Sequence, residues 1–301
     1  MAKALADEFV GARRVLLEVD EALGQHLSQL MFDGPQDELT LTANAQPALM
    51  AASLAAIRVL EAEAGLDLAR DAAFVAGHSL GEYSALAAAG SLSVAETAKL
   101  LRIRGKAMQD AVPVGVGAMA ALLGVEVEAA AGIASEAAKE AGAGAVCDVA
   151  NDNGGGQVVV SGSADAVRRA IEIAKAKGAR RSVLLPVSAP FHCSLMQPAA
   201  EAMSAALETV DIRRPAAPLV ANVLAAAVTD PEEIRRLLVK QVTGAVRWRE
   251  SLLFMAAKGV GVFVECGAGK VLSGLAKRVC PEATGVSIEF PADILAYKSR
   301  A

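Results

Sequence analysis

The alternation of apolar and polar residues predicts a helical start to the chain and a different organisation from about residue 117. Apolar residues recur at nearly helical spacing over residues 1–23, which predicts an opening helix with no strand before it. Residues 46–65 carry a proline near the start of an apolar pattern and a glycine at its end, as a second helix would. The short apolar run of residues 71–77 predicts a buried strand, followed by a turn and a helix over residues 82–90.

From residue 117 the pattern predicts a small subdomain inserted into a larger one. Its predicted elements follow the order β-α-β-β-α-β, which is typical of the ferredoxin-like or split-βαβ unit. In this order they occupy residues 118–125, 127–143, 145–152, 157–163, 164–179 and 180–187. We therefore expect a ferredoxin-like small subdomain over residues 117–187. The larger subdomain, residues 1–116 and 188–301, alternates helices with short strands, which favours an α/β fold with a mostly parallel sheet.

Composition and charge exclude several classes of function. Hydrophobic residues make up 54% of the 301 residues, and the net charge of −5 gives no general attraction to nucleic acid or anionic membranes. No apolar stretch approaches the ~20 residues that span a bilayer, so we expect no membrane association and a cytoplasmic location. The cysteines have no Cys-x-x-Cys spacing, which predicts buried free thiols and no metal site. They are Cys147, Cys193, Cys266 and Cys280.

The segment GHSLGEYSAL, residues 77–86, contains the first candidate for catalysis. Ser79 lies between two glycines, directly after the predicted strand and before the predicted helix, as a nucleophile elbow requires. Small neighbours permit a sharp turn that pushes the hydroxyl out, and the backbone N–H of Leu80 is then free to face an oxyanion. A glycine-rich turn with an idle serine is the alternative.

A catalytic serine needs a general base, and histidine suits that role at neutral pH. His26 lies beside a polar residue on the first helix, and His78 adjoins the serine, where neighbouring side chains usually point apart. Elimination therefore favours the third histidine, His192, in the loop SAPFHCSLM. Cys193 is an alternative nucleophile, although its place next to a histidine suits acid–base geometry poorly. No aspartate or glutamate stands out as a third member, so another group must orient the imidazole.

Arg104 breaks the pattern of an amphipathic helix predicted over residues 93–112. It falls on the apolar stripe of this helix, whereas two lysines and another arginine lie on a polar stripe. A buried guanidinium is costly unless it is paired, and its planar fork fits a carboxylate through two hydrogen bonds. We therefore hypothesise that Arg104 receives a substrate carboxylate near Ser79. An internal salt bridge and a surface arginine with a buried stem stay open as alternatives.

Five motifs in order along the chain carry a resemblance to a known family. They are GHSLGEYSAL, RIRGKAMQ, PVSAPFHCSLM, VKQVTGAVRW and VECGAGKVLSGL. Together they resemble the malonyl-CoA:acyl carrier protein transacylases of fatty acid synthesis, from the first helix to about residue 278. The resemblance implies an α/β-hydrolase-like large subdomain with a ferredoxin-like insertion. It also implies an acylated Ser79 and the base His192, with Arg104 as the clamp for the malonyl carboxylate.

The resemblance gives two more residues a role. Gln241 matches the position whose backbone carbonyl, in place of a carboxylate, holds the histidine. Phe191 matches a form that is associated with malonyl rather than methylmalonyl units, and simple core packing is the alternative for this residue.

The resemblance further implies a two-step transfer without a metal or a tightly bound cofactor. Malonyl-CoA would acylate Ser79, and the phosphopantetheine thiol of an acyl carrier protein would then take the malonyl group. Because such carriers are usually acidic, we expect a basic docking patch, with a solvated helix end as the alternative. The candidate segment is KAKGARR, with Lys175, Lys177, Arg180 and Arg181. We expect a monomer.

Three other functions stay open. A serine thioesterase or esterase would share the elbow and use water as the acceptor, and its activity would be indifferent to Arg104. A stand-alone polyketide acyltransferase would share the chemistry and serve a different carrier. A non-catalytic scaffold with a relic site is the third.

The start of the chain departs from the family. The family begins with a strand that ends in a Phe-Pro-Gly-Gln-Gly turn, whose glutamine region supplies a second oxyanion donor, whereas this sequence starts at the helix MAKALADEF. We expect a natural protein that is longer at this end, and an impaired product is the alternative.

Overall fold

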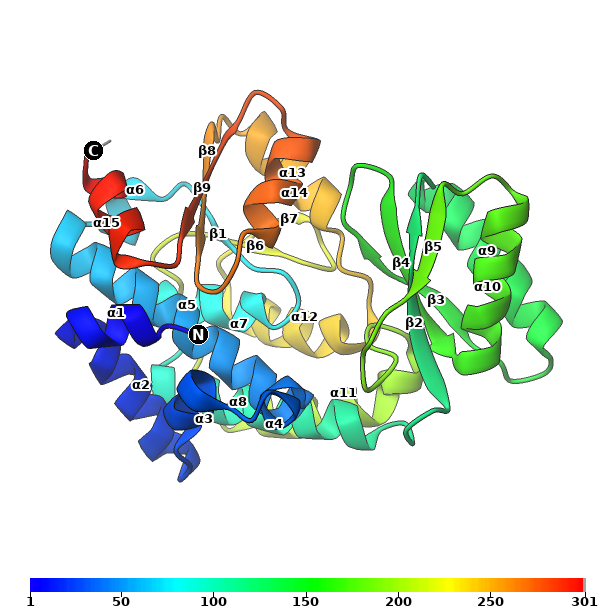
Figure 1. Cartoon of the computed structure of the whole chain (residues 1–301), viewed down its shortest axis with the longest axis horizontal. Coiled ribbons are helices and arrows are strands. Elements are labelled where there is room, and N and C mark those ends of the chain that lie inside the picture. The colour runs from blue at the N-terminus through cyan, green and yellow to red at the C-terminus, as the bar shows by residue number, and fades with distance from the viewer. Residues whose placement is uncertain (300–301) are drawn as a thin grey trace.

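A computed structural model describes residues 1–299 and contains two groups of elements side by side (Figure 1). One group combines many helices with two short sheets, and the other, green in Figure 1, is a four-stranded sheet with two helices. The helices of the first group are α1 (Lys3–Glu8), α2 (Val10–Leu23), α3 (Leu27–Asp33), α4 (Gln36–Thr40), α5 (Thr42–Ala64), α6 (Leu68–Asp71), α7 (Gly81–Ala88), α8 (Val94–Asp110), α11 (Gln197–Glu208), α12 (Pro231–Thr243), α13 (Trp248–Ala257), α14 (Val271–Val279) and α15 (Pro291–Lys298), with the 3-10 turn η1 (Ser194–Met196).

The prediction of one helix over residues 1–23 is wrong. Phe9 has extended backbone angles, φ −114° and ψ 128°, which separate α1 from α2. Because Phe9 fits the apolar spacing on both sides, the pattern did not reveal this break. The second predicted helix is present as α5, and it ends at Gly65, which takes up the left-handed conformation at φ +67°.

The first group holds two small sheets instead of one continuous sheet. β1 (Val75–Ala76) pairs in parallel with β6 (Leu219–Ala221), and β7 (Ala226–Val228) is antiparallel to β6. β8 (Val262–Cys266) and β9 (Thr284–Ile288) form a separate parallel pair. Parallel pairing was predicted for this region, as were β1, β6 and β8, whereas β7 and β9 were not.

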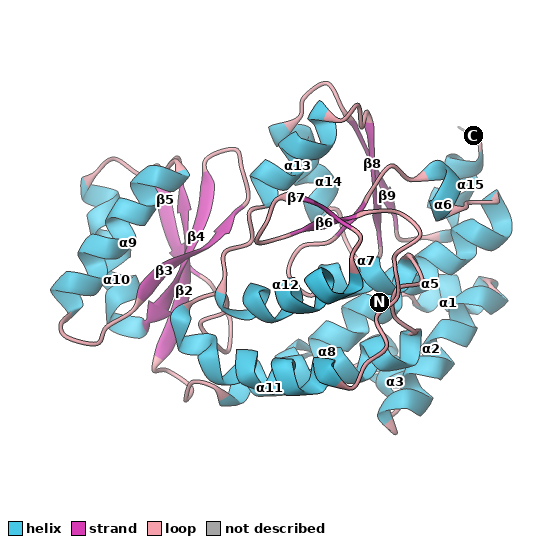
Figure 2. Cartoon of the chain, turned by 180° about the vertical axis from the view of Figure 1, so that it is seen from behind, coloured by secondary structure: helices cyan, strands magenta, loops and turns pink. Residues whose placement is uncertain are grey.

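The main apolar core lies among α2, α5, α8 and α11, which form a helical layer beneath the two sheets (Figure 2). The apolar stripe predicted for α8 is buried throughout, and it consists of Val94, Ala98, Leu101, Met108 and Val112. Over residues 1–299, no helix combines the length and the apolar character that crossing a membrane requires.

The second group contains the predicted β-α-β-β-α-β succession. Its elements are β2 (Gly117–Leu123), α9 (Val127–Ala141), β3 (Cys147–Asp152), β4 (Gln157–Ser163), α10 (Ala164–Ala176) and β5 (Arg181–Leu184). The strands pair antiparallel in the order β3-β4-β2-β5. Alternate residues of β2 face opposite ways: Leu122 joins a core under α9 and α10, whereas Met119 and Ala121 join the cluster on the other face, against Phe191. The subdomain boundaries 116/117 and 187/188 stay a prediction, which limited proteolysis would test.

Candidate active site

The sharp turn between β1 and α7 presents Ser79. Its φ of +54° is a conformation that residues other than glycine rarely adopt. Gly77 must be a glycine, since a Cβ there would lie 2.0 Å from the backbone carbonyl of Gly81, whereas a Cβ at Gly81 would meet open space. Asn222 holds the strained turn from both sides. Its side-chain oxygen accepts from the Ser79 N–H at 2.7 Å, and its amide donates to the Gly77 carbonyl at 2.8 Å.

His192 lies against the hydroxyl of Ser79. Its Nε2 is 2.7 Å from Ser79 Oγ, and its Nδ1 is 2.9 Å from the Gln241 carbonyl oxygen and 3.1 Å from that of Gly244. Because a carbonyl oxygen only accepts hydrogen bonds, Nδ1 carries the proton and Nε2 accepts from the serine hydroxyl. Two backbone carbonyls therefore orient this imidazole without a carboxylate.

Burial determines the charge state of His192. The residue is 3% exposed, and this burial, assisted by the nearby charge of Arg104, lowers the pKa of His192 to about 3. The imidazole is then neutral at pH 7 and able to take the proton of the serine. Neither of the other two histidines contacts the serine hydroxyl in the described part of the chain. His78 Nε2 lies 2.9 Å from the side-chain oxygen of Asn153, and His26 is exposed at the start of α3.

Arg104 extends into the same site from α8 and is 1% exposed. Its Nη2 donates to Ser79 Oγ at 3.1 Å and to Gln241 Oε1 at 2.8 Å, and its Nη1 donates to Gln46 Oε1 at 2.7 Å. All three partners are neutral groups, and no carboxylate among the described residues pairs with this guanidinium, so the alternatives of a salt bridge and of a surface arginine are wrong. Arg104 Nε is buried and lacks a hydrogen-bond partner in the described part of the chain.

Close packing of two helices places Arg104. A Cβ at Gly105 would lie 2.5 Å from the Thr42 carbonyl oxygen, so only a glycine lets α8 approach α5 this closely. The approach brings Gln46 of α5 to the guanidinium. The ring of Tyr83 lies 5.7 Å from Arg104 Cζ on another side. The positive charge is thus held between amide oxygens and an aromatic ring, beside the serine hydroxyl.

The remaining predicted residues differ in their surroundings. Leu80 precedes the first residue of α7, and its backbone N–H has no acceptor within residues 1–299, so it is available to an oxyanion. Phe191 is half-buried and packs between the main core and the inner face of the four-stranded sheet. Cys193 is fully buried and donates to the Pro190 carbonyl at 3.0 Å, and burial raises the pKa of its thiol. These contacts give no support to Cys193 as a nucleophile.

Sequence analysis missed three buried polar residues that contact this site. Gln46 is 3% exposed, and Glu82 and Asn222 are fully buried. The available signal was a polar residue inside an apolar segment, as in PLVANV and GEYSAL. No cluster of three His, Cys, Asp or Glu side chains that could hold a metal ion occurs in the described part of the chain.

The chemistry of such a site is acyl transfer. A serine hydroxyl beside a neutral histidine, at the end of a parallel strand, is able to take an acyl group as an ester and to release it to a second nucleophile. A guanidinium next to the hydroxyl favours acyl groups that carry a negative charge. Fold and site together define an α/β enzyme of the acyltransferase class.

Comparison with known proteins identifies the family. The family model described as "Acyl transferase domain" matches residues 1–287, and the chain belongs to this family. The malonyl CoA-acyl carrier protein transacylase of Bacillus subtilis is 43% identical over 294 residues, which cover 98% of this chain and 90% of that protein. The transacylase of the same name from Escherichia coli K12 is 41% identical over 93% of this chain and 88% of its own length.

Solved structures show the same similarity. An acyl-carrier-protein-S-malonyltransferase from Bartonella henselae has a TM-score of 0.96 and 54% identity, over 100% of this chain and 94% of that one. A malonyl-transacylase in complex with a type II PKS acyl-carrier protein has a TM-score of 0.95 and 38% identity, over 100% of this chain and 95% of that one. The two-subdomain α/β fold predicted from the sequence is therefore confirmed.

Proposed function

We propose that this enzyme transfers a malonyl group from malonyl-CoA to the phosphopantetheine thiol of an acyl carrier protein, through a malonyl ester on Ser79. One observation carries the choice of a malonyl group: the guanidinium of Arg104 is buried and lies 3.1 Å from the nucleophile. A buried cation in contact with the reacting hydroxyl suits an acyl chain that ends in a carboxylate. The names of the relatives support the same choice.

In the first half of the reaction Ser79 attacks the thioester carbonyl. His192 Nε2 takes the hydroxyl proton as the new C–O bond forms, and the Leu80 N–H faces the oxyanion. The C–S bond then breaks, and the protonated histidine returns its proton to the sulfur of coenzyme A. The Gln241 and Gly244 carbonyls hold Nδ1–H throughout and stabilise the transient positive charge of the imidazole.

In the second half the carrier thiol replaces coenzyme A. Its proton passes to His192, its sulfur attacks the malonyl carbonyl, and the ester C–O bond breaks as Ser79 regains the proton. Water must be excluded, because hydrolysis of the ester would waste the acyl group. Arg104 would hold the malonyl carboxylate in both halves of the reaction. Its Nε has no partner in the described part of the chain, and the carboxylate would replace Gln46 or Gln241 as an acceptor for Nη1 or Nη2. Phe191, next to the base, would limit the size of the acyl group.

Two arginines, Arg180 of the predicted basic patch and Arg278, support a docking surface close to this site. A Cβ at Gly124 would lie 3.1 Å from the Arg180 side chain, and one at Gly155 would lie 3.5 Å from that of Arg278. Because Gly124 also adjoins Gly156, both arginines border the glycine turn between β3 and β4. That turn follows Asn153, the partner of His78, so it begins beside the side chain of the residue that precedes the nucleophile.

We propose that the basic rim, consisting of Arg180, Arg181, Lys277 and Arg278, receives the acidic carrier. All four are exposed, and none forms an ion pair with another described residue. We leave the two lysines of the predicted patch out of the rim, because Lys177 is already paired with Glu136 and no contact of a described residue places Lys175 beside the glycine turn. Arg180→Glu combined with Arg278→Glu should slow transfer to the carrier at least tenfold and leave malonyl loading from CoA within about twofold. An equal loss in both half-reactions would contradict this assignment.

The test of the main proposal is mass spectrometry of the protein after incubation with malonyl-CoA. The peptide that contains Ser79 should gain one malonyl group, and Ser79→Ala should gain none. Adding holo-carrier should move the group to the carrier, whereas a thioesterase would release free malonate. No malonyl mass on an intact wild-type protein would favour a relic site.

Parallel incubations address the finer expectations. Methylmalonyl-CoA tests the selectivity proposed for Phe191, and carriers of fatty acid and polyketide synthesis distinguish the two possible pathways. We also propose a monomer that acts in the cytoplasm without nucleic acid, and light scattering of the purified protein would reveal a larger assembly.

A further inference from the structure

A buried carboxylate lies behind the nucleophile, where neither half-reaction uses it. Glu82 of α7 is fully buried. Its Oε2 accepts from Gln241 Nε2 at 2.6 Å and from the Asn222 backbone N–H at 3.3 Å, whereas its Oε1 has no partner among the described residues. A buried charge is costly to keep, so a carboxylate held by one short hydrogen bond at this position needs an explanation.

The contacts of Gln241 supply the explanation. Its amide Nε2 donates to Glu82 and to the Ser79 carbonyl, and its Oε1 accepts from Arg104 Nη2 at 2.8 Å. An amide offers a donor on one side and an acceptor on the other, and a flipped amide would direct its NH₂ group at the guanidinium. Burial raises the pKa of Glu82 to about 7. In either charge state Oε2 is the acceptor, because it already accepts from the Asn222 N–H and a proton would reside on Oε1, so Glu82 favours the orientation in which the Gln241 oxygen faces Arg104.

The geometry points to Glu82 as a positioning residue that fixes the orientation of the Gln241 side chain between Ser79 and Arg104. This inference rests on the proposed function, because its consequence is the placement of the guanidinium that receives the acyl carboxylate. When Glu82 is ionised, the same arrangement also gives Arg104 a counter-charge, which acts across a bridging amide and leaves the guanidinium open to the substrate.

Three variants test this role through the ratio of malonyl to acetyl loading. Glu82→Leu keeps the volume and removes the acceptor, and we expect kcat/KM for loading from malonyl-CoA to fall roughly ten- to a hundredfold, with less than a threefold change for acetyl-CoA. Glu82→Gln can still present an oxygen to Gln241, so it should retain more malonyl loading than Glu82→Leu. Leu86→Ala on the same helix is the matched control, since it damages the core at a fully buried residue outside this network and should leave the ratio unchanged.

A double variant tests whether Glu82 acts through Gln241. If it does, adding Glu82→Leu to Gln241→Leu should change malonyl loading by less than about threefold, because the effects of residues in one network are not additive. Additive losses, or a Glu82→Leu variant that lowers both loadings equally as Leu86→Ala does, would overturn the role. A wild-type protein that takes up no malonyl group would instead refute the proposed function.

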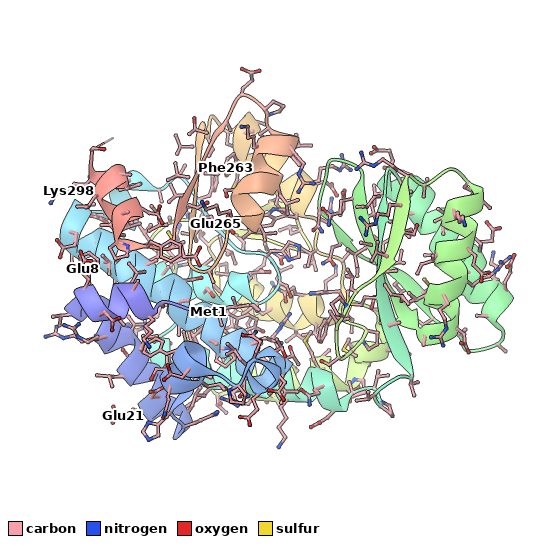
Figure 3. The ribbon with its side chains drawn as sticks, viewed as in Figure 1. Met1, Glu8, Glu21, Phe263, Glu265 and Lys298 are labelled. Atoms are coloured by element: carbon pink, nitrogen blue, oxygen red, sulfur yellow. The ribbon has the colours of Figure 1, made fainter. Side chains whose placement is uncertain are left out.

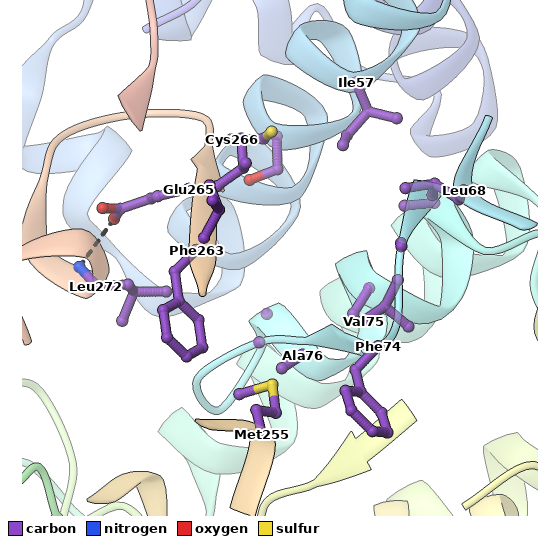
Figure 4. A pocket seen from close by; sticks show the side chains of 18 of the residues that line it. Ile57, Leu68, Phe74, Val75, Ala76, Met255, Phe263, Glu265, Cys266 and Leu272 are labelled. Atoms are coloured by element: carbon purple, nitrogen blue, oxygen red, sulfur yellow. Dashed lines mark hydrogen bonds between the residues drawn. The ribbon is translucent and has the colours of Figure 1, made fainter. Parts of the chain in front are cut away.

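An apolar cavity of about 470 Å³ also adjoins the nucleophile turn (Figure 4). Its lining includes Leu272 and two residues of β8, Phe263 and Glu265, which Figure 3 also labels. The residues Glu82, Gln241 and Arg104 do not line this cavity. Leu272→Ala is therefore a second control, which should leave the ratio of malonyl to acetyl loading unchanged.

Discussion

Replacing Arg104 with methionine is the sharpest test of how this site selects its acyl group. Methionine keeps most of the side-chain length and removes the charge and the fork. In the proposed complex Arg104 makes two charge-assisted hydrogen bonds to the malonyl carboxylate, each contributing about 1.5–3 kcal/mol. Part of this gain is offset, because the free enzyme already satisfies Nη1 and Nη2 with Gln46 and Gln241.

We therefore expect Arg104→Met to lose transition-state stabilisation at the lower end of this range, about 3 kcal/mol for the two hydrogen bonds together. This loss corresponds to about a 150-fold fall in kcat/KM for loading from malonyl-CoA. Acetyl-CoA carries no acyl carboxylate, so its loading does not depend on these two hydrogen bonds. Arg104 also lies 3.1 Å from Ser79 Oγ, so acetyl loading should change too, by less than about tenfold. The malonyl-to-acetyl ratio should thus fall at least about tenfold.

The assay is the rate of mass gain on the Ser79 peptide, at thioester concentrations well below KM and separately for malonyl-CoA and acetyl-CoA. Arg104→Lys, which keeps the charge without the fork, should fall between the wild type and Arg104→Met. Thermal unfolding of each variant checks that the fold persists. Equal losses of kcat/KM for the two thioesters would show that Arg104 supports the Ser79 turn and does not select the acyl group.

Three further predictions follow from backbone packing and from burial. Gly77→Ala should lower the free energy of unfolding by at least ~3 kcal/mol or prevent folding, whereas Gly81→Ala in the same motif should lower it by less than ~1 kcal/mol. Urea unfolding measures both values, and equal losses would contradict the packing argument. Gly105→Ala should lower the free energy of unfolding by ~1–3 kcal/mol, and the loss in kcat/KM, expressed as a free energy, should be larger. By contrast, Gly132→Ala on an exposed helix face should raise the free energy of unfolding by ~0.5–1 kcal/mol, because the added Cβ meets no atom within 4 Å. Because the pKa of His192 is lowered from 6.5 to about 3, the unfolded chain takes up a proton at a higher pH than the folded protein does. The stability of the wild type should therefore fall as the pH drops below 6.5. His192→Gln should lose less stability than the wild type between pH 7 and pH 5, and an identical loss would refute this reasoning.

The ferredoxin-like succession was predictable because its two helices are long and amphipathic and two of its strands are long apolar runs. β2 and β4 are seven residues long with buried centres, and α10 has a strongly amphipathic pattern. The first group was less predictable, since β1 has two residues and β6 and β7 have three each. Elements this short carry no usable period, and their pairing depends on partners far away in the sequence.

The same difference in range separates the predicted and missed parts of the site. Ser79 and Arg104 were predicted from local signals, a turn motif and a charge on an apolar stripe. Asn222 was missed, because its bond to Ser79 spans 143 residues, and a polar residue inside the apolar segment PLVANV does not by itself show which partner it has. The salt-bridge alternative for Arg104 could only be rejected once Gln46 and Gln241 were known to be its partners.

The absence of a carboxylate at His192 Nδ1 fits the role proposed for Arg104. An aspartate at His192 Nδ1 would raise the basicity of the imidazole permanently and would place a negative charge in the site. Here two carbonyls hold Nδ1–H, and the charge of Arg104 contributes to the low pKa of His192. A malonyl carboxylate bound to Arg104 would neutralise that charge and raise the pKa of the histidine. The acyl group that the site selects would thus also strengthen the base that activates Ser79, whereas acetyl-CoA and water would meet a weaker one.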